Sequence, residues 1–306
     1  MLYWLKQKLK KNYFIYFISF FLYQKIFMFC YGKLQNYILF LINYKKNKIF
    51  KSHINETRKI ILYNKEFYYP KYSIFYEKFF KNFEEKRTLN IDYNFITREF
   101  FEKEIECILD VGANIGYYSL FCNEFFSDKF KIHCFEPHPV SYYFLKKNLS
   151  SFDNIKLYNF ALGSENKEDY MSIPDHESHR LSNLGTMSVG QNSNNLKAKI
   201  LIKKFDSLTI SLQQFKSIYI KIDVEGYEDN VLKGMLNFLH NDINLYLKIE
   251  INKDFHNIAK ISSIINFIEK LNYKFFILKN GKFINYNKSQ IIKFLIYRNE
   301  DLFCKK

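Results

Sequence analysis

Acidic residues stand at the ends of several apolar, strand-like runs, where a parallel sheet could bring them together. Asp110 ends the run ILD, Glu136 ends CFE, and Asp223 and Glu225 follow the run IKI in IKIDVEG. Glu250 occupies a similar position in LKIEIN. The carboxyl ends of adjacent strands in an open α/β sheet border one crevice, so we expect these carboxylates to lie near one another. Such groups can accept hydrogen bonds from hydroxyls or remove a proton.

A glycine-rich turn follows the first of these runs. Gly112 allows the backbone to approach a ligand, Ala113 and Asn114 continue the turn, and Gly116 permits a helix to pack closely on the strand. The N-terminus of that helix would direct unpaired N–H groups at a ligand. The spacing is neither the dinucleotide pattern GxGxxG nor a P-loop. A turn without any ligand is the alternative.

Glu136 is the candidate ligand for a ribose. A carboxylate at the tip of the second strand can accept hydrogen bonds from the 2′ and 3′ hydroxyls of a nucleoside. The alternative is an exposed acid at a strand end. Among the other acids, Glu228 and Glu225 could instead favour the N-terminus of the next helix, which is a weaker explanation for Asp223.

The elements that must position these residues alternate between strand and helix. We expect strands at Cys107–Val111, Lys131–Phe135, Ile155–Phe160, Ser217–Ile222 and Leu245–Ile251. We expect helices at Tyr117–Phe126, Pro139–Leu149, Glu228–Leu239 and Asp254–Leu271. This alternation predicts an α/β fold with a mostly parallel sheet and helices on both faces. Asn280-Gly281 predicts a two-residue hairpin turn that adds antiparallel strands, and residues 174–195 predict a long loop.

Charge and hydropathy divide the chain into three parts. The net charge is +15, and ten lysines lie in residues 1–51, which contain no Arg, Asp or Glu. We predict a basic, aromatic N-terminal arm (residues 1–52), a helical lead-in (53–104) and the main domain (105–306). The five scattered cysteines indicate buried, reduced thiols in a cytoplasmic protein.

The N-terminal arm has three interpretations. Its apolar runs at residues 13–23 and 26–31 could form helices that pack on the main domain. The lysines and aromatic residues could instead rest on the anionic inner face of a membrane, making the protein peripheral there. A membrane span is the third, but it would have to include Gln24 and Lys25.

At this point the ordered motifs resemble a known family. DVGANIGYYSL, FEPHP, NFALGSENKE, KKFDSL, IKIDVEGYEDNVLKGM and LKIEIN, in this order, are similar to the FkbM-type family of S-adenosylmethionine (SAM)-dependent methyltransferases. The resemblance runs from about residue 105 to about residue 278. It implies a Rossmann-like class I methyltransferase sheet of seven strands with the last one antiparallel, and SAM as cofactor. It also implies O-methylation, commonly of sugar hydroxyls in glycans or glycosylated metabolites.

The resemblance also assigns residues. Asp110, Gly112, Ala113, Asn114 and Gly116 match the cofactor loop. Glu136 matches the ribose acid, and Ala161 and Leu162 match the segment near the adenine. Many related methyltransferases carry an acid before that alanine, where this chain has Phe160, so adenine recognition would rely on backbone groups and stacking.

Transfer to a hydroxyl needs a base, and carboxylates of the fourth and fifth strands are the candidates. We rank Asp223 first, followed by Glu225 and Glu250. A rival hypothesis makes these acids ligands of Mg²⁺, which would lower the pKa of the hydroxyl; we do not favour it and assign no metal ligands. His176, His179 and His256 are alternative bases, although solvated loop histidines are the simpler interpretation.

Two other functions compete with a sugar methyltransferase. A nucleic-acid methyltransferase would suit the basic arm, but IDVEG is unlike the Asn/Asp-Pro-Pro-aromatic tip that holds a flipped base. The arm also lacks Arg, the residue preferred for reading bases. The second competitor is a non-catalytic module that binds a cofactor or a membrane. The sequence leaves the acceptor and the oligomeric state open.

Overall fold

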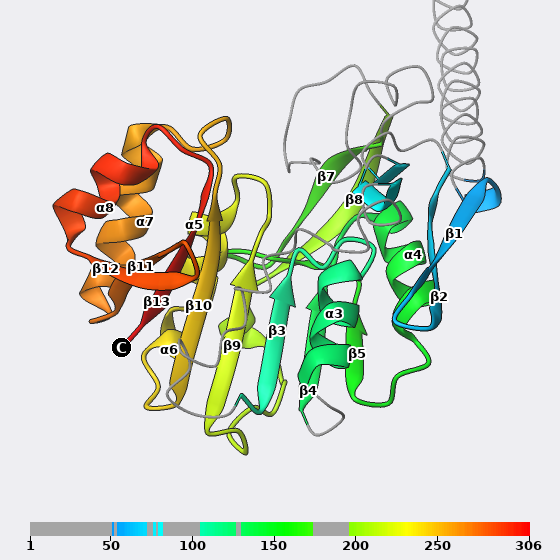
Figure 1. The fold of residues 1–306 in the computed structure, drawn as a ribbon, viewed down its shortest axis with the longest axis horizontal. Helices are drawn as coiled ribbons and strands as arrows, with labels where there is room; N and C mark the ends of the chain where they lie inside the picture. Colours follow the sequence, from blue (N-terminus) through cyan, green and yellow to red (C-terminus); the bar gives the residue numbers. More distant parts are fainter. Residues whose placement is uncertain are drawn as a thin grey trace, which may run out of the picture. The chain divides into compact units, whose positions relative to one another are not determined.

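An eight-stranded sheet forms the centre of the protein. The computed structural model describes residues 51, 54–71, 76–77, 79–81, 105–126, 130–173 and 196–306. The sheet has the strand order β12-β11-β13-β10-β9-β3-β4-β5 (Figure 1). Its strands are β3 (Cys107–Val111), β4 (Lys131–Phe135), β5 (Ile155–Tyr158), β9 (Ser217–Ile222), β10 (Asn244–Ile251), β11 (Lys274–Lys279), β12 (Lys282–Tyr286) and β13 (Glu300–Lys305).

Most of this sheet is parallel, as the alternating pattern predicts. β5, β4, β3, β9 and β10 are parallel neighbours, while the last strand, β13, inserts antiparallel between β10 and β11. The fold class is therefore confirmed as the α/β sheet of class I methyltransferases with an antiparallel last strand. β12 is an additional edge strand beyond the seven expected.

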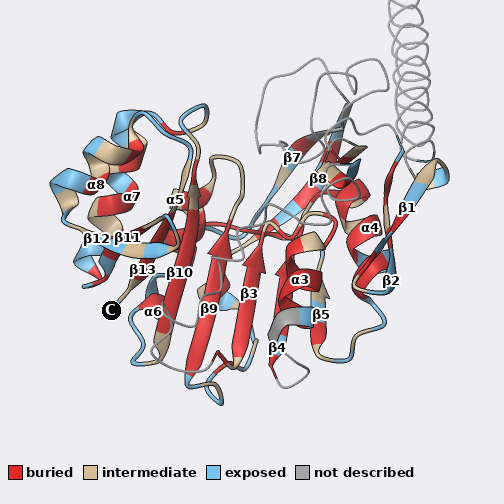
Figure 2. Cartoon of the chain, viewed as in Figure 1, coloured by how far each residue is buried: buried red, intermediate tan, exposed pale blue. Residues whose placement is uncertain are grey.

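The strands form because short apolar runs are buried on both faces. Every residue of β3 and of β9 is buried (Figure 2). Leu109 and Ile220 belong to one continuous core that extends to helices α5 (Glu228–Gly234) and α7 (Ile258–Lys270). Asp110 and Lys221 alternate to the opposite face of the sheet. Strands covered on both sides read as continuous apolar sequence, so a charged residue inside one is unusual.

The helices agree closely with the sequence pattern. Their bounds are α3 (Tyr117–Phe126), α4 (Pro139–Leu149), α5 (Glu228–Gly234), α6 (Leu236–Leu239), α7 (Ile258–Lys270) and α8 (Lys288–Leu295). The helix expected over 228–239 is divided at Met235 into α5 and α6. The helix α7 begins later than expected because Asn257 caps it, accepting a hydrogen bond from the backbone N–H of Lys260.

The predicted Asn-Gly hairpin is present between β11 and β12. Asn280 and Gly281 have φ angles of 49° and 75°. Two consecutive positive φ values are typical of the type I′ turn that joins two antiparallel strands.

A second, three-stranded sheet contains β6 (Ala161–Leu162), β8 (Leu196–Lys203) and β7 (Lys167–Ile173), in that order. The long loop predicted at 174–195 falls between β7 and β8 and lies outside the described residues. His176 and His179 belong to it.

The prediction of a helical lead-in is wrong for residues 57–70. These residues form an antiparallel hairpin of β1 (Thr57–Leu62) and β2 (Lys65–Pro70). Its turn is made by Tyr63 and Asn64 with φ angles of 51° and 62°. The hairpin is fastened to α4 by Asn148, whose Oδ1 accepts from Tyr68 N–H at 2.7 Å and whose Nδ2 donates to Tyr68 O at 2.9 Å. Figure 1 shows the hairpin beside α4.

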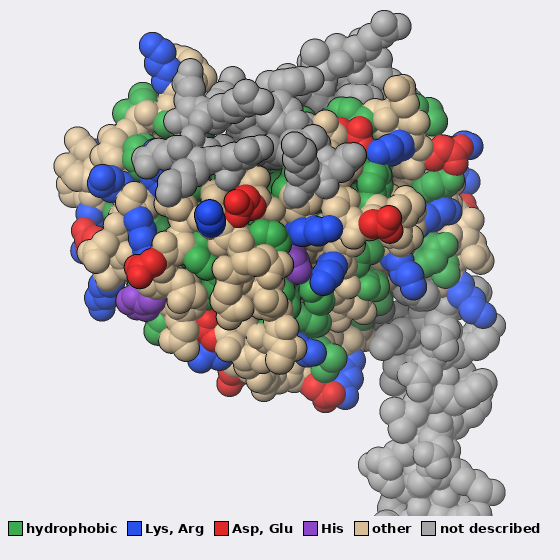
Figure 3. All heavy atoms as spheres, turned by 90° about the horizontal axis from the view of Figure 1, so that it is seen from below, with side chains coloured by type: hydrophobic (Ala, Val, Ile, Leu, Met, Phe, Trp, Pro, Cys, Tyr) green, Lys and Arg blue, Asp and Glu red, His purple; other side chains and the backbone are tan. Residues whose placement is uncertain are grey.

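The chain divides into two units, residues 1–52 and 53–306. The basic arm forms the first unit and, apart from residue 51, lies outside the described residues. Within the described ranges, no helix combines the length and hydropathy that crossing a membrane requires. On the face seen from below in Figure 3, lysine and arginine side chains are interspersed with acidic ones. Four cysteines of the described ranges are buried and unbridged, as expected: Cys107, Cys122, Cys134 and Cys304.

Candidate active site

The glycine turn after β3 packs directly on the backbone that follows β9. Gly112, Asn114 and Gly116 all have positive φ angles, of 82°, 52° and 89°. A Cβ at Gly112 would lie 1.8 Å from the carbonyl oxygen of Asp223, and one at Gly116 would lie 2.7 Å from Leu149 Cδ1. Glycine is therefore favoured at both positions, at Gly112 by the approach of the Asp223 backbone and at Gly116 by the packing of α4. Approach of a ligand to Gly112 stays a prediction.

Glu136 is bonded to the same turn from the tip of β4. Its Oε2 accepts from Asn114 N–H at 2.9 Å, and its Oε1 accepts from His138 N–H at 2.7 Å. The side chain is 6% exposed. Burial raises the pKa of Glu136 to about 7, although the two backbone donors oppose this shift. The structure thus brings the predicted ribose acid and the predicted cofactor loop together.

Asp110 lies beneath the loop. It is completely buried, its Oδ2 accepts from Ser119 Oγ at 2.6 Å, and its Oδ1 lies 3.2 Å from Lys221 Nζ. Both carboxylate oxygens are therefore engaged by protein groups. Direct contact of Asp110 with a cofactor stays a prediction.

Ala161 and Leu162 are buried in β6, where they pair with Ile202 and Lys203 of β8. Phe160, in place of the acid found in many relatives, contacts Phe135 with a ring-centroid distance of 5.7 Å. The residue before Ala161 thus belongs to a pair of contacting aromatic rings. The role of this segment in binding adenine stays a prediction.

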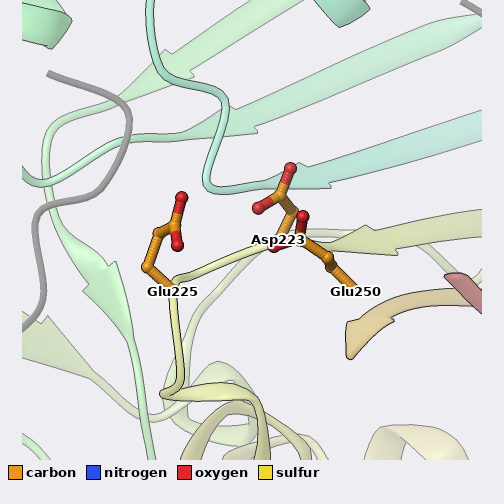
Figure 4. Close-up of side chains that lie close together, drawn as sticks. All are labelled: Asp223, Glu225 and Glu250. Carbon is orange, nitrogen blue, oxygen red and sulfur yellow. The ribbon is translucent and has the colours of Figure 1, made fainter. Parts of the chain in front are cut away.

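Three carboxylates meet at the tips of β9 and β10. One oxygen from each of Asp223, Glu225 and Glu250 lies within 4.8 Å of the others (Figure 4). Asp223 and Glu250 are linked by a side-chain hydrogen bond, while Glu225 approaches them from the following turn with a φ of 52°. The three candidate bases are therefore brought together. Their spacing would also suit a divalent cation, so the Mg²⁺ hypothesis, which we do not favour from the sequence, stays an alternative.

The charges of this cluster are unequal. Burial opposes ionisation of Asp223, but the Lys221 ammonium and the hydrogen bond from Glu250 hold the pKa of Asp223 below its usual value. Burial and the Asp223 charge raise the pKa of Glu250 to about 9. Burial, followed by the charges of Asp223 and Glu228, raises the pKa of Glu225 to about 8. At neutral pH, Asp223 is thus the ionised member of the cluster.

Lys221 is a site residue that the sequence analysis missed. Its Nζ lies 3.2 Å from Asp223 Oδ2 and 3.2 Å from the carbonyl oxygen of Gly112, in addition to its contact with Asp110. Burial disfavours the ammonium, but Asp110 and Asp223 raise the pKa of Lys221 above its ordinary value. A lysine inside a completely buried strand was the signal that could have revealed it.

Glu228 and His256 support the turn that carries Glu225. Glu228 Oε1 accepts from the N–H groups of Val224 and Gly226 at 3.2 and 3.1 Å. Its Oε2 lies 2.7 Å from His256 Nε2, and both side chains are buried. His256 therefore fastens the turn, and the alternative of a solvated loop histidine is wrong.

The mostly parallel sheet with an antiparallel last strand and the glycine turn before a helix define the fold as that of the class I methyltransferases. The chain belongs to the FkbM methyltransferase family, because the model of the methyltransferase FkbM domain matches residues 110–275, more than half of its length.

Known proteins similar to the chain include the hexuronic acid methyltransferase AglP of Haloferax volcanii. The two are 28% identical over 165 residues, which cover 53% of this chain and 63% of the relative. The match therefore spans less than two thirds of the relative's length.

Two solved structures are also similar to the chain. One is the precorrin-6y C5,15-methyltransferase of Geobacter metallireducens, with 12% identity and a TM-score of 0.35, covering 67% of this chain and 82% of that one. The other is a SAM-dependent O-methyltransferase of Thermotoga maritima, with 9% identity and a TM-score of 0.36, covering 81% of this chain and 77% of that one.

Proposed function

We propose that this protein transfers a methyl group from SAM to a hydroxyl of a sugar, in a glycan or a glycosylated metabolite. The observation that carries the proposal is the contact between the two halves of the site. The cofactor loop at Gly112 packs against the backbone of Asp223, so a cofactor held by that loop and Glu136 would lie next to the carboxylate cluster.

Each part of the site then has a chemical task. Bound SAM supplies an electrophilic methyl group in need of an aligned acceptor. Glu136 binds the ribose hydroxyls, and the Gly112–Gly116 turn brings its backbone close to the cofactor. The N–H groups of Gly112, Ala113, Asn114 and Gly116 already donate to protein acceptors, so they hold the shape of the turn. Asp223, ionised at neutral pH, accepts the proton of the acceptor hydroxyl, while Glu225 and Glu250 lie close enough to bind neighbouring hydroxyls.

The acceptor class is supported by the hexuronic acid methyltransferase among the similar proteins. A hexuronic acid offers both hydroxyls and a carboxylate as acceptors. Only a hydroxyl needs a base, and an acceptor carboxylate beside ionised Asp223 would be repelled by like charge. The carboxylate cluster therefore favours an ether product over an ester.

Transfer of labelled methyl from SAM to oligosaccharides containing hexuronic acid or neutral hexose tests the proposal. Mild alkali releases a methyl ester but leaves an ether, so we expect alkali-stable label. Asp223→Asn should lower kcat by about 10²-fold or more, while Glu165→Gln, at an exposed ion pair with Lys167, should leave it unchanged. Alkali-labile label, transfer to nucleic acid instead of saccharide, or full turnover by Asp223→Asn would contradict the proposal.

We further propose that residues 1–51 hold the protein on an anionic membrane face. Their ten lysines, interspersed with aromatic residues, support electrostatic attraction and interfacial insertion. The full chain should sediment with vesicles containing phosphatidylserine and remain in solution with phosphatidylcholine vesicles. Equal partition with both kinds of vesicle would contradict this role.

A further inference from the structure

Tyr76 precedes the family-matched region in the chain, yet it contacts the cofactor loop. Tyr76 and Phe80 are both helical residues, and Tyr76 is 3% exposed. Its hydroxyl donates a hydrogen bond to Asn114 Oδ1 at 2.6 Å. A buried hydroxyl with such a short bond fixes the orientation of its acceptor.

Asn114, which accepts that bond, has an uncommon backbone conformation in the cofactor loop. Asn114 has a φ of 52°, a conformation that L-residues other than Asn and Asp rarely adopt. In this conformation its backbone N–H donates to Glu136 Oε2 at 2.9 Å. One residue therefore connects the hydroxyl of Tyr76 with the carboxylate expected to bind the ribose.

Tyr76 belongs to a cluster of aromatic rings. The ring of Tyr76 stacks on that of Phe80, with 6.2 Å between the ring centroids, and lies 6.4 Å from the ring centroid of Tyr69 in β2. The hairpin that carries Tyr69 is fastened by Asn148, whose Nδ2 also donates to the carbonyl oxygen of Ile115 at 2.8 Å. The N-terminal segment is thus linked to two successive residues of the cofactor loop. Tyr76 bonds Asn114 directly, whereas Asn148 of α4 connects Tyr68 with Ile115.

We propose that Tyr76 is a positioning residue of the cofactor site, which holds Asn114 in the conformation that presents its N–H to Glu136. The β1–β2 hairpin and the segment with Tyr76 are then parts of the SAM site, although they lie outside the matched family domain. This inference rests on the proposed function, because it assumes that the loop and Glu136 bind SAM.

A double-mutant cycle with the full chain tests the inference, with the affinity for S-adenosylhomocysteine measured by calorimetry. Tyr76→Phe keeps the ring and removes the hydroxyl, and Asn114→Gly keeps the positive φ and removes the acceptor. We expect Tyr76→Phe to raise Kd about fivefold in the wild-type background. In the Asn114→Gly background it should change Kd less than about twofold, because the bond is already lost.

Tyr297→Phe is the matched control, since it removes the hydroxyl of a tyrosine that is 77% exposed, and its Kd should equal the wild-type value. An unchanged Kd in Tyr76→Phe, even with a lower melting temperature of the ligand-free protein, would overturn the inference and leave the proposed function intact. The same fold-change in both backgrounds would overturn it too. Absence of binding by the wild-type chain would overturn both.

Discussion

The ammonium group of Lys221 lies 3.2 Å from the carboxylate of Asp223, at the point where the two halves of the site meet. The same group contacts Asp110 below the cofactor loop and the carbonyl oxygen of Gly112 within it. A single buried cation therefore joins the strand that carries the cofactor loop to the residue that we propose as base.

Replacing Lys221 by Met should destabilise the fold. Asp110 is completely buried and would lose its charged partner, and an uncompensated buried charge costs about 3–5 kcal/mol. Urea unfolding monitored by circular dichroism measures this loss. Lys233→Met, which breaks an exposed pair with Asp229, should cost less than about 1 kcal/mol. Equal stability losses in the two variants would contradict the structural role of Lys221.

The pH dependence of stability should reveal the buried Glu136. Burial raises its pKa from 4.5 to about 7, so the folded chain holds this proton more tightly than the unfolded chain does. Its contribution to stability is therefore complete below about pH 4.5 and is lost as pH rises through about 7. The free energy of unfolding should fall more steeply with pH in the wild type than in Glu136→Gln, with a difference of about 3 kcal/mol by pH 8.

Urea titrations of both proteins between about pH 5 and 8 measure this difference. Glu225 and Glu250 titrate in both proteins, so the comparison isolates Glu136. Parallel pH profiles of the two proteins would show that Glu136 titrates normally.

The sequence was sufficient to predict the elements whose signals are local. β3, β4, β9, α3 and α4 occupy the expected residues because each is an apolar run with clear boundaries. The β1–β2 hairpin was missed because its turn is Tyr63-Asn64, which has the positive φ angles of a type I′ turn without the usual glycine. β8 was also missed, although LKAKILIK alternates as a half-buried strand does; it pairs with β7, from which residues 174–195 separate it in the chain.

Gly112→Ala should abolish the cofactor site. The new Cβ would lie 1.8 Å from Asp223 O, so the loop must separate from the β9 tip. We expect no detectable binding of S-adenosylhomocysteine by calorimetry, together with a lower melting temperature. The control is Gly281→Ala, because Gly281 in the β11–β12 turn has a similar φ of 75°. This variant should lose about 1 kcal/mol of stability through backbone strain and bind as the wild type does. Wild-type affinity in Gly112→Ala would contradict the close approach.

Glu228→Ala should unfasten the turn that carries Glu225. The variant leaves the N–H groups of Val224 and Gly226 and the imidazole of His256 without their acceptor. A loss of about 3 kcal/mol in the free energy of unfolding is expected, compared with less than about 1 kcal/mol for Glu269→Ala at an exposed pair with Lys288. Similar losses would mean that Glu228 does not support the turn.

Residues of the site could be predicted only where one short motif contains both the strand end and the functional residue. Gly112, Glu136 and Asp223 could be placed at strand tips, and the topology then brings them together. Tyr76 could not be found in this way, because its partner Asn114 is 38 positions away in the chain. Lys221 pairs with neighbouring Asp223, but its contact with Asp110 joins residues 111 positions apart. Whether Asp110 contacts the cofactor depends on which side chains surround it, and the sequence does not contain that information.

Calorimetric titration with S-adenosylhomocysteine tests the central claim most directly, namely that the tips of β3 and β4 form a SAM site. The wild-type chain should bind it, and Glu136→Ala should weaken binding by about 10²-fold or more through the loss of charge-assisted bonds to the ribose. Glu165→Ala, at an exposed residue, should bind as the wild type does. No binding by the wild type, or the same affinity in Glu136→Ala, would contradict the account.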